Sequence, residues 1–244
     1  MNLEPILAAP RDTVPRPLMR QSWLDLTFLH WRYEASAVRP LVPPDLELDL
    51  YEGAAWVGLV PFRIAGLTHP RAPAIPWLSN FPETNVRTYV FDRSGRRGVW
   101  FFSLDAARWP AVLGARAAYA LPYYWARMRV DTGESAVHYR SERLAGPAAR
   151  TDIAVQVGAP IPQPNELELF LTARFRLYAR RGKSLLRADI EHQPWPLQQA
   201  HLLGLEQSVV EAAGLPAPAG ETLVHFASRV DVLVGAPLPL PLAS

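Results

Sequence analysis

Prolines are spread through the whole sequence, and they constrain its fold more than any other feature. The chain of 244 residues contains 25 prolines, about twice the usual share. Proline breaks the interior of a helix and is tolerated at turns, at strand edges and in the first helical turn. We therefore expect long helices to be rare and short strands joined by turns to dominate.

Alternation of apolar and polar residues marks the expected strands. Residues 23–31 alternate, with Leu24, Leu26 and Phe28 on one face of an extended chain. Residues 54–62 (AAWVGLVPF) form a short apolar run, typical of a strand that is buried on both faces. The alternating residues 85–91 lead through a turn at 92–98 (DRSGRRG) into a strand at 99–104, which predicts a hairpin. Further strands are expected at 123–131, 136–142, 151–157, 174–180, 184–192 and 222–234.

Helices are expected at three places. Residues 110–119 are rich in alanine and begin with a proline, which suits a first helical turn. Asn165 precedes two glutamates, the arrangement of a helix N-cap followed by an acidic first turn. Residues 197–213 are also predicted to be helical. Residues 64–82 contain four prolines and are predicted to form a long ordered loop.

The order of these elements predicts one mainly β domain over residues 1–244. The sequence has no internal repeat and no shift in composition that would mark a boundary. Residues 1–20 are expected to be an extended N-terminal arm, and residues 236–244 a proline-rich tail. Roughly nine or ten short strands with frequent turns are typical of a closed barrel or a sandwich.

Composition excludes several classes of function. With 25 basic and 23 acidic residues the net charge is +2, which gives little support for a nucleic-acid partner. The chain has no cysteine, and its six histidines show no metal-ligand spacing, so we expect neither a metal nor another cofactor. We find no signal peptide and no apolar run of about 18 residues, so we expect a cytoplasmic protein without a membrane partner. The oligomeric state stays open.

Glu83 and Arg87 are the first candidates for chemistry. They lie four residues apart in an expected strand, so their side chains share one face. They could pair with each other, as buried charges usually do. Alternatively, they could point into a cavity and bind a polar ligand, where arginine presents its guanidinium fork to a carboxylate.

Arg116 and the adjacent Tyr123 and Tyr124 form a second group of candidates. Two neighbouring tyrosines on a strand point to opposite faces, so one of them could reach the interior. Both could also be ordinary core aromatics.

Several tracts together carry a family resemblance. They include residues 55–62 (AWVGLVPF), 83–90 (ETNVRTYV), 98–106 (GVWFFSLDA), 120–124 (ALPYY) and 192–197 (HQPWPL). In these tracts the sequence resembles an uncharacterised bacterial family, domain of unknown function 2071, which is a distant relative of acetoacetate decarboxylase. The resemblance covers about residues 20–235. It implies a mainly β (α+β) fold: a closed antiparallel β-barrel with two or three short peripheral helices and an internal cavity.

The resemblance also suggests which residues face that cavity. A cavity glutamate of the decarboxylases matches Glu83, a helix arginine matches Arg116, and the catalytic lysine pair falls on Tyr123 and Tyr124. A phenol cannot form the imine that these enzymes require. The only lysine, Lys183, lies in an expected hairpin turn. We therefore predict no Schiff-base chemistry. The expected ligand-binding residues are Glu83, Arg87, Arg116, Tyr123 and Tyr124 with the aromatic residues Trp56 and Phe102.

Three hypotheses for the function follow. The first is a barrel that binds a small carbonyl or carboxylate compound. The second is a lysine-independent lyase, hydratase or isomerase in which Glu83 acts as general base and a tyrosine, Tyr123 or Tyr124, as acid. The third, weaker hypothesis is an interaction protein whose barrel is filled by side chains. Whether the chain is an enzyme is left open.

Overall fold

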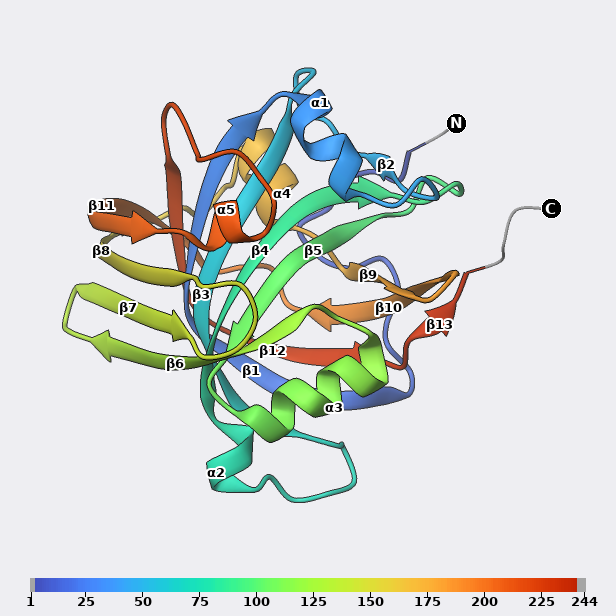
Figure 1. Ribbon diagram of the computed structural model, residues 1–244, viewed down its shortest axis with the longest axis horizontal. Coiled ribbons are helices and arrows are strands. Elements are labelled where there is room, and N and C mark those ends of the chain that lie inside the picture. Colours follow the sequence, from blue (N-terminus) through green and yellow to red (C-terminus); the bar gives the residue numbers. More distant parts are fainter. Residues whose placement is uncertain (1–2, 241–244) are drawn as a thin grey trace.

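One continuous sheet forms most of the molecule (Figure 1). The computed structural model of the chain describes residues 3–240. The strands are β1 (Pro17–Tyr33), β2 (Glu47–Leu48), β3 (Ala55–Thr68), β4 (Phe81–Phe91), β5 (Arg97–Ala106), β6 (Tyr123–Thr132), β7 (Ala136–Arg143), β8 (Arg150–Pro160), β9 (Arg176–Arg181), β10 (Ser184–His192), β11 (Leu197–Gln207), β12 (Leu223–Gly235) and β13 (Leu238–Pro239). The helices are α1 (Ala35–Val38), α2 (Pro76–Ser79), α3 (Trp109–Tyr119), α4 (Glu166–Thr172) and α5 (Val209–Ala212), with one 3₁₀ turn at Arg39–Leu41.

The sheet closes into two rings that share five strands. β12, β1, β3, β4 and β5 are neighbours in that order. Strands β9 and β10 connect β5 back to β12 on one side. Strands β6, β7, β8 and β11 connect the same two strands on the other side. The mainly β architecture expected from the sequence is therefore confirmed.

Each closed side encloses its own hydrophobic core, and the shared strands contribute to both. On β1, Leu26 and Phe28 belong to the first core, whereas Leu29 and Trp31 belong to the second. The two cores lie on opposite faces because successive side chains of a strand point in opposite directions. The nearly continuous apolar character of β3 has the same origin, since both of its faces are buried.

Two strand pairs differ from an all-antiparallel arrangement. β5 pairs in parallel with β9 near its start and with β6 near its end. Helix α3 connects β5 to β6 and carries the chain back, so that both strands start from the same end. A parallel pair needs such a crossover connection.

The predicted helix at residues 197–213 is wrong. Residues Leu197–Gln207 form β11, which pairs antiparallel with β8 and with β12, and only Val209–Ala212 are helical. The residues of this segment are good helix formers, but hydrogen bonds at both strand edges override that intrinsic preference.

The ends of the chain are more ordered than the sequence suggests. β1 begins at Pro17, inside the expected arm of residues 1–20, and β13 of the expected tail pairs with β10. Residues 241–244 of that tail lie outside the described residues. The long loop predicted at 64–82 is shorter, because β3 extends to Thr68 and α2 occupies part of the remainder. No helix among the described residues is long and apolar enough to span a bilayer.

Candidate functional site

A cavity of about 430 Å³ lies inside the ring that β9 and β10 close. Its walls are mostly apolar side chains from β1, β3 and β5 and from helix α3. Three of the polar groups on its wall come from one strand, β4, which contributes Glu83, Asn85 and Arg87. Tyr123, the first residue of β6, adds a hydroxyl group. Such an apolar hollow with a few convergent polar groups is the usual form of a small-molecule site.

The spacing along β4 explains why three polar side chains meet there. Glu83, Asn85 and Arg87 are two residues apart and so share one face of the strand. All three are buried, with 4%, 4% and 9% of their surface exposed. The sequence analysis did not name Asn85. The signal was present, because Asn85 lies between Glu83 and Arg87 in the same alternation.

Glu83 forms a hydrogen-bonded pair with Tyr123. The Tyr123 hydroxyl donates to Oε2 of Glu83 at 2.7 Å. Burial raises the pKa of Glu83 to about 8, and the nearby Asp105 adds to this, while the hydrogen bond from Tyr123 acts in the opposite direction. Burial also raises the pKa of Tyr123 well above its usual 10. At neutral pH both groups therefore keep their protons, and the pair carries no charge.

Arg87 has no carboxylate partner among the described residues. Its guanidinium lies over the rings of Phe28 and Tyr89, with centroid distances of 5.6 and 5.9 Å. Nη2 donates a long hydrogen bond of 3.4 Å to the Leu171 carbonyl, and Nε is buried without a partner. The alternative in which Glu83 neutralises Arg87 does not occur in this structure. The guanidinium at the cavity wall is left with aromatic faces, the neutral Tyr89 hydroxyl and one weak carbonyl acceptor.

Asn85 also presents a free polar atom. Its Oδ1 is buried and has no hydrogen-bond partner among the described residues. Buried polar atoms without a partner are rare in folded proteins, and each calls for a physical explanation. A ligand that offers a donor to Asn85 and acceptors to Arg87 would satisfy both.

Of the two tyrosines, only Tyr123 reaches the cavity. Tyr124 lies on the other side of β6, where the Arg143 guanidinium stacks on its ring at 4.0 Å. The ring also fills the space beside Gly146, where an added Cβ would come within 2.6 Å of it. Arg116 is exposed on helix α3, and its Nε donates to the backbone carbonyl of Tyr123 at 2.7 Å. Tyr124 and Arg116 are thus neighbours of the site and do not line the cavity.

Phe102 and Trp56 also lie away from this cavity, for two different reasons. The pairing of β4 with β5 shifts by one residue, so that Arg87 lies opposite Phe101 and Phe102 is the extra residue. This bulge turns Phe101 toward the cavity in place of Phe102. Trp56 has the same phase on β3 as the cavity residue Val60, but it lies four residues, or roughly 13 Å, further along the strand.

A buried polar network lies behind Arg87. Nε2 of His30 and the Tyr89 hydroxyl are 2.6 Å apart, and that hydroxyl donates to the Leu171 carbonyl at 2.5 Å. Burial, with Arg87 next in size, holds the pKa of His30 well below its usual range, so the imidazole is neutral. Since the tyrosine proton is used on Leu171, Nε2 of His30 is the donor in this contact. The network holds Tyr89 beneath the guanidinium of Arg87.

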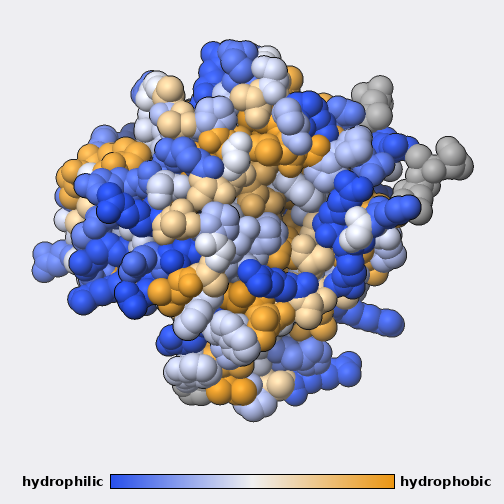
Figure 2. All heavy atoms as spheres, in the orientation of Figure 1, coloured by the Kyte–Doolittle hydropathy of each residue, from blue (hydrophilic) through white to orange (hydrophobic). Residues whose placement is uncertain are grey.

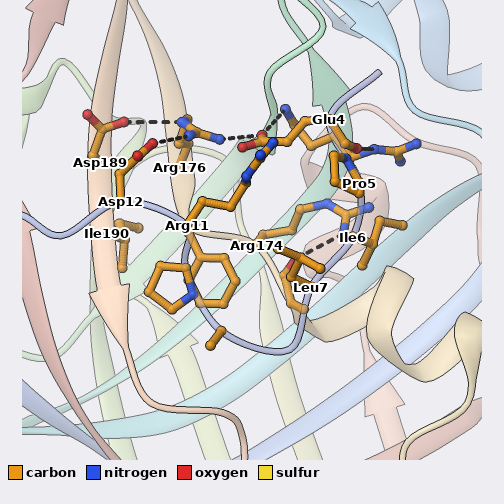
Figure 3. Close-up of a pocket in the computed structure, with 15 residues that line it drawn as sticks. Glu4, Pro5, Ile6, Leu7, Arg11, Asp12, Arg174, Arg176, Asp189 and Ile190 are labelled. Carbon is orange, nitrogen blue, oxygen red and sulfur yellow. Dashed lines mark hydrogen bonds and ion pairs between the residues drawn. The ribbon is translucent and has the colours of Figure 1, made fainter. Parts of the chain in front are cut away.

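A second, much smaller cavity lies beneath the N-terminal arm (Figure 3). It encloses about 40 Å³, room for little more than one water molecule. Most of its charges are already paired: Glu4 with Arg176 at 2.5 Å, Asp189 with Arg176 at 3.3 Å and Asp49 with Arg174 at 3.0 Å. This cavity is therefore a small gap left where the N-terminal arm packs on the sheet, and a poor candidate for a ligand site.

The described residues contain no group of three or more side chains placed to hold a metal ion.

Residues 20–231 match the domain of unknown function 2071 (DUF2071), which is described as an uncharacterized conserved protein. The chain belongs to this family. The DUF2071 chain is also 40% identical over 218 residues to the uncharacterized protein YqjF of Bacillus subtilis (strain 168). The aligned region covers 88% of this chain and 90% of YqjF.

Solved structures resemble the fold of this DUF2071 protein at low sequence identity. The enduracididine biosynthesis enzyme MppR in complex with pyruvate matches with a TM-score of 0.66 at 14% identity, over 95% of this chain and 93% of the other. The acetoacetate decarboxylase of Legionella pneumophila matches with a TM-score of 0.65 at 14% identity, over 96% and 92%. The DUF2071 chain thus has the fold of the acetoacetate decarboxylases, as the sequence resemblance implied.

Proposed function

We propose that this protein binds a small organic carboxylate that also carries a carbonyl or hydroxyl oxygen, inside the cavity beside Glu83 and Arg87. The observation that carries the proposal is the buried guanidinium of Arg87 without a carboxylate partner. Burying an unpaired charge is costly, and a ligand carboxylate would offset that cost. Arginine is suited to this role because its fork of donors matches the two oxygens of a carboxylate.

The Glu83–Tyr123 pair would hold the second oxygen of the ligand. With a pKa of about 8, Glu83 keeps its proton at neutral pH and can donate a hydrogen bond from the carboxyl group. A neutral donor next to a cationic one suits a ligand with one charged and one uncharged oxygen function. Asn85, which lies between them, would accept from a hydroxyl or amide group of the ligand.

The apolar walls limit the rest of the ligand to a hydrocarbon part. Phe62, Leu104 and Leu177 line the cavity, and all three are buried. Covering them with apolar surface would be favourable by about 25 cal/mol per Å². The structural relatives support the same class of compound: MppR is described in complex with pyruvate and with a condensation product of pyruvate.

Binding would not use an imine. The resemblance to the decarboxylases puts their lysine pair at Tyr123 and Tyr124 of this chain. The only lysine, Lys183, is exposed in the turn between β9 and β10. The ligand would therefore be held by hydrogen bonds and charge, with no covalent bond to a side-chain amine.

Calorimetric titration with matched carboxylates and neutral analogues tests the proposal. The panel is pyruvate, acetoacetate and longer 2-oxo acids, each beside its methyl ester. We expect the acids to bind and the esters to bind at least tenfold more weakly, because only the acids can form the charged pair. Replacing Arg87 by methionine should abolish that preference. The matched control is Arg127→Met, since Arg127 is an exposed residue of β6 paired with Glu142.

Two results would contradict the proposal. One is equal binding of acids and esters. The other is unchanged affinity in the Arg87→Met variant, provided that circular dichroism shows that the variant is folded.

A second function, acid–base catalysis on the same ligand class, is favoured by one specific observation. A carboxyl group with a pKa of about 8 is close to the best value for proton transfer at neutral pH. In this alternative Glu83 exchanges the proton next to the ligand carbonyl. Incorporation of deuterium into 2-oxo acids in D₂O, followed by NMR, should then depend on Glu83 and be lost in Glu83→Gln. The third hypothesis, a filled interior, is disfavoured by the size of the cavity.

A further inference from the structure

The mouth of the cavity lies between one loop and one helix. The exposed residues on the cavity wall are His69 from the loop before α2, and Pro110, Gly114 and Ala118 from α3. Figure 1 shows α2 with its loop protruding at one end of the molecule, next to α3.

Large apolar side chains project into solvent around the mouth. Ile75 and Trp77 lie on the protruding loop, and Trp109 and Leu113 lie on the adjacent helix α3. All four are among the exposed large hydrophobic residues of the described chain, with 62% of Trp77 and 52% of Trp109 accessible. Figure 2 shows apolar side chains reaching the surface at this end of the molecule. We call these four residues the mouth patch.

The two segments that carry the mouth patch contain basic residues and no acidic ones. Residues 64–82 and 106–130 contain no aspartate or glutamate, but they carry Arg71, Arg108 and Arg116 close to the patch. Arg71 and Arg116 are exposed. The guanidinium of Arg108 lies over the ring of Trp77 at 5.3 Å, and its Nε donates to the Trp77 carbonyl at 2.8 Å. This contact joins α2 to the start of α3, so that Trp77 lies beside Arg108 and its neighbour Trp109.

The geometry points to the docking of this surface on an anionic lipid bilayer. Exposed tryptophans beside arginines are typical of the interface between membrane and water, where the ring lies at headgroup level and the cation meets lipid phosphate. A protruding tip suits insertion into a deformable lipid surface better than contact with a flat protein face. The cavity mouth would then open toward the bilayer. The sequence predicted no membrane partner because it lacks a spanning segment, and surface docking needs none.

Co-sedimentation of the full chain with lipid vesicles tests this inference independently of ligand binding. One set of vesicles is phosphatidylcholine alone, and the other contains phosphatidylglycerol as well. We expect binding to the anionic vesicles only, and weaker binding as salt is added. Each arginine near the surface contributes about fivefold in affinity, so Arg71→Glu should reduce binding by at least that factor. The double variant Trp77→Ala, Trp109→Ala should abolish it.

Matched controls separate docking from a general effect of charge or exposed apolar surface. Leu203 on β11 is as exposed as Trp77, at 62%, and Arg150 is an exposed arginine on β8. Both strands belong to the ring that does not enclose the cavity. Leu203→Ala and Arg150→Glu should bind the vesicles as the unchanged chain does. The inference is overturned if the chain binds neither kind of vesicle, or if the tryptophan variant binds as well as the parent. It is also overturned if light scattering shows that the parent is a dimer and the tryptophan variant a monomer.

Discussion

At the scale of single residues, the site depends on what burial does to three polar side chains of one strand and to the tyrosine opposite. Glu83 is neutral at pH 7 because burial raises its pKa, while the Arg87 guanidinium lies on aromatic faces. The two residues lie on one strand face as their spacing predicts, yet each has its own partners. The cavity therefore presents one cationic and one neutral donor.

Replacing Glu83 by glutamine should change how stability depends on pH. The pKa of Glu83 is about 8 in the folded protein against 4.5 ordinarily, so between these values the folded protein holds a proton that the unfolded chain has lost. The stability from this group is complete below about pH 4.5 and decreases as the pH rises to 8. We expect Glu83→Gln to be more stable than the parent by a few kcal/mol at pH 8 and about equal at pH 4.5, in urea unfolding. Glu142→Gln, at an exposed position, should show no such trend. A parallel pH profile in parent and Glu83→Gln would contradict the assignment.

Removing the Tyr123 hydroxyl should raise the pKa of Glu83 further. The hydrogen bond from Tyr123 acts to lower this pKa, so its loss leaves burial unopposed. We expect ¹³C NMR of labelled glutamate to give a pKa above about 8 in Tyr123→Phe. Tyr124→Phe is the matched control, because Tyr124 packs under Arg143 on the opposite side of β6. A lowered pKa in Tyr123→Phe, or an equal shift in Tyr124→Phe, would refute this description of the pair.

At the scale of elements, helix α3 determines both the crossover to β6 and one side of the cavity mouth. It ends at Tyr119, and the C-cap residue Ala120 has a left-handed φ of 56°. That conformation costs a residue with a Cβ about 1 kcal/mol, whereas glycine adopts it freely. The helix is thus slightly strained at the point where the chain turns into the segment that carries Tyr123.

Ala120→Gly should stabilise the protein by up to about 1 kcal/mol, because it removes this strain. Ala117→Gly serves as the control within the same helix. Ala117 is exposed in a helical conformation, so glycine there should destabilise by about 1 kcal/mol. Thermal and urea unfolding of the two variants should shift in opposite directions. A destabilised Ala120→Gly would show that the end of α3 is held differently.

Elements with a strong local signal could be predicted from the sequence. The hairpin of β4 and β5 and the helix capped by Asn165 are confirmed, since alternation, turn residues and the N-cap are local properties. The bulge that exchanges Phe102 for Phe101 could not be predicted, because a one-residue shift arises from pairing between strands. The helix prediction for residues 197–213 was wrong for the same kind of reason, because pairing with β8 and β12 makes most of this segment a strand. Which tyrosine faces inward likewise follows from where β6 begins.

At the scale of the whole molecule, ring closure creates an interior that side chains leave partly unfilled. The exposed residues of the cavity wall lie on α3 and on the loop before α2. Access can therefore be blocked without touching the polar groups. Gly114 offers the means, since a Cβ added there meets no atom within 4 Å.

Gly114→Phe should close the mouth and abolish ligand binding while the fold is retained. The new ring would occupy empty space, and replacing a helical glycine costs no helix propensity. We expect the free energy of unfolding to stay within about 1 kcal/mol of the parent and binding in the calorimeter to disappear. Gly204→Phe is the control: Gly204 on β11 is equally unobstructed and remote from the mouth. Undiminished binding by Gly114→Phe would show that ligands enter elsewhere or bind outside.

A crystal structure of the protein with a bound 2-oxo acid tests the central claim most directly. We predict ligand density inside the cavity, with the carboxylate within hydrogen-bond distance of the Arg87 guanidinium and the oxo oxygen facing Glu83 and Tyr123, and no bond to an amine. A cavity without ligand at saturating concentration, or a carboxylate held by residues other than Arg87, would contradict the account.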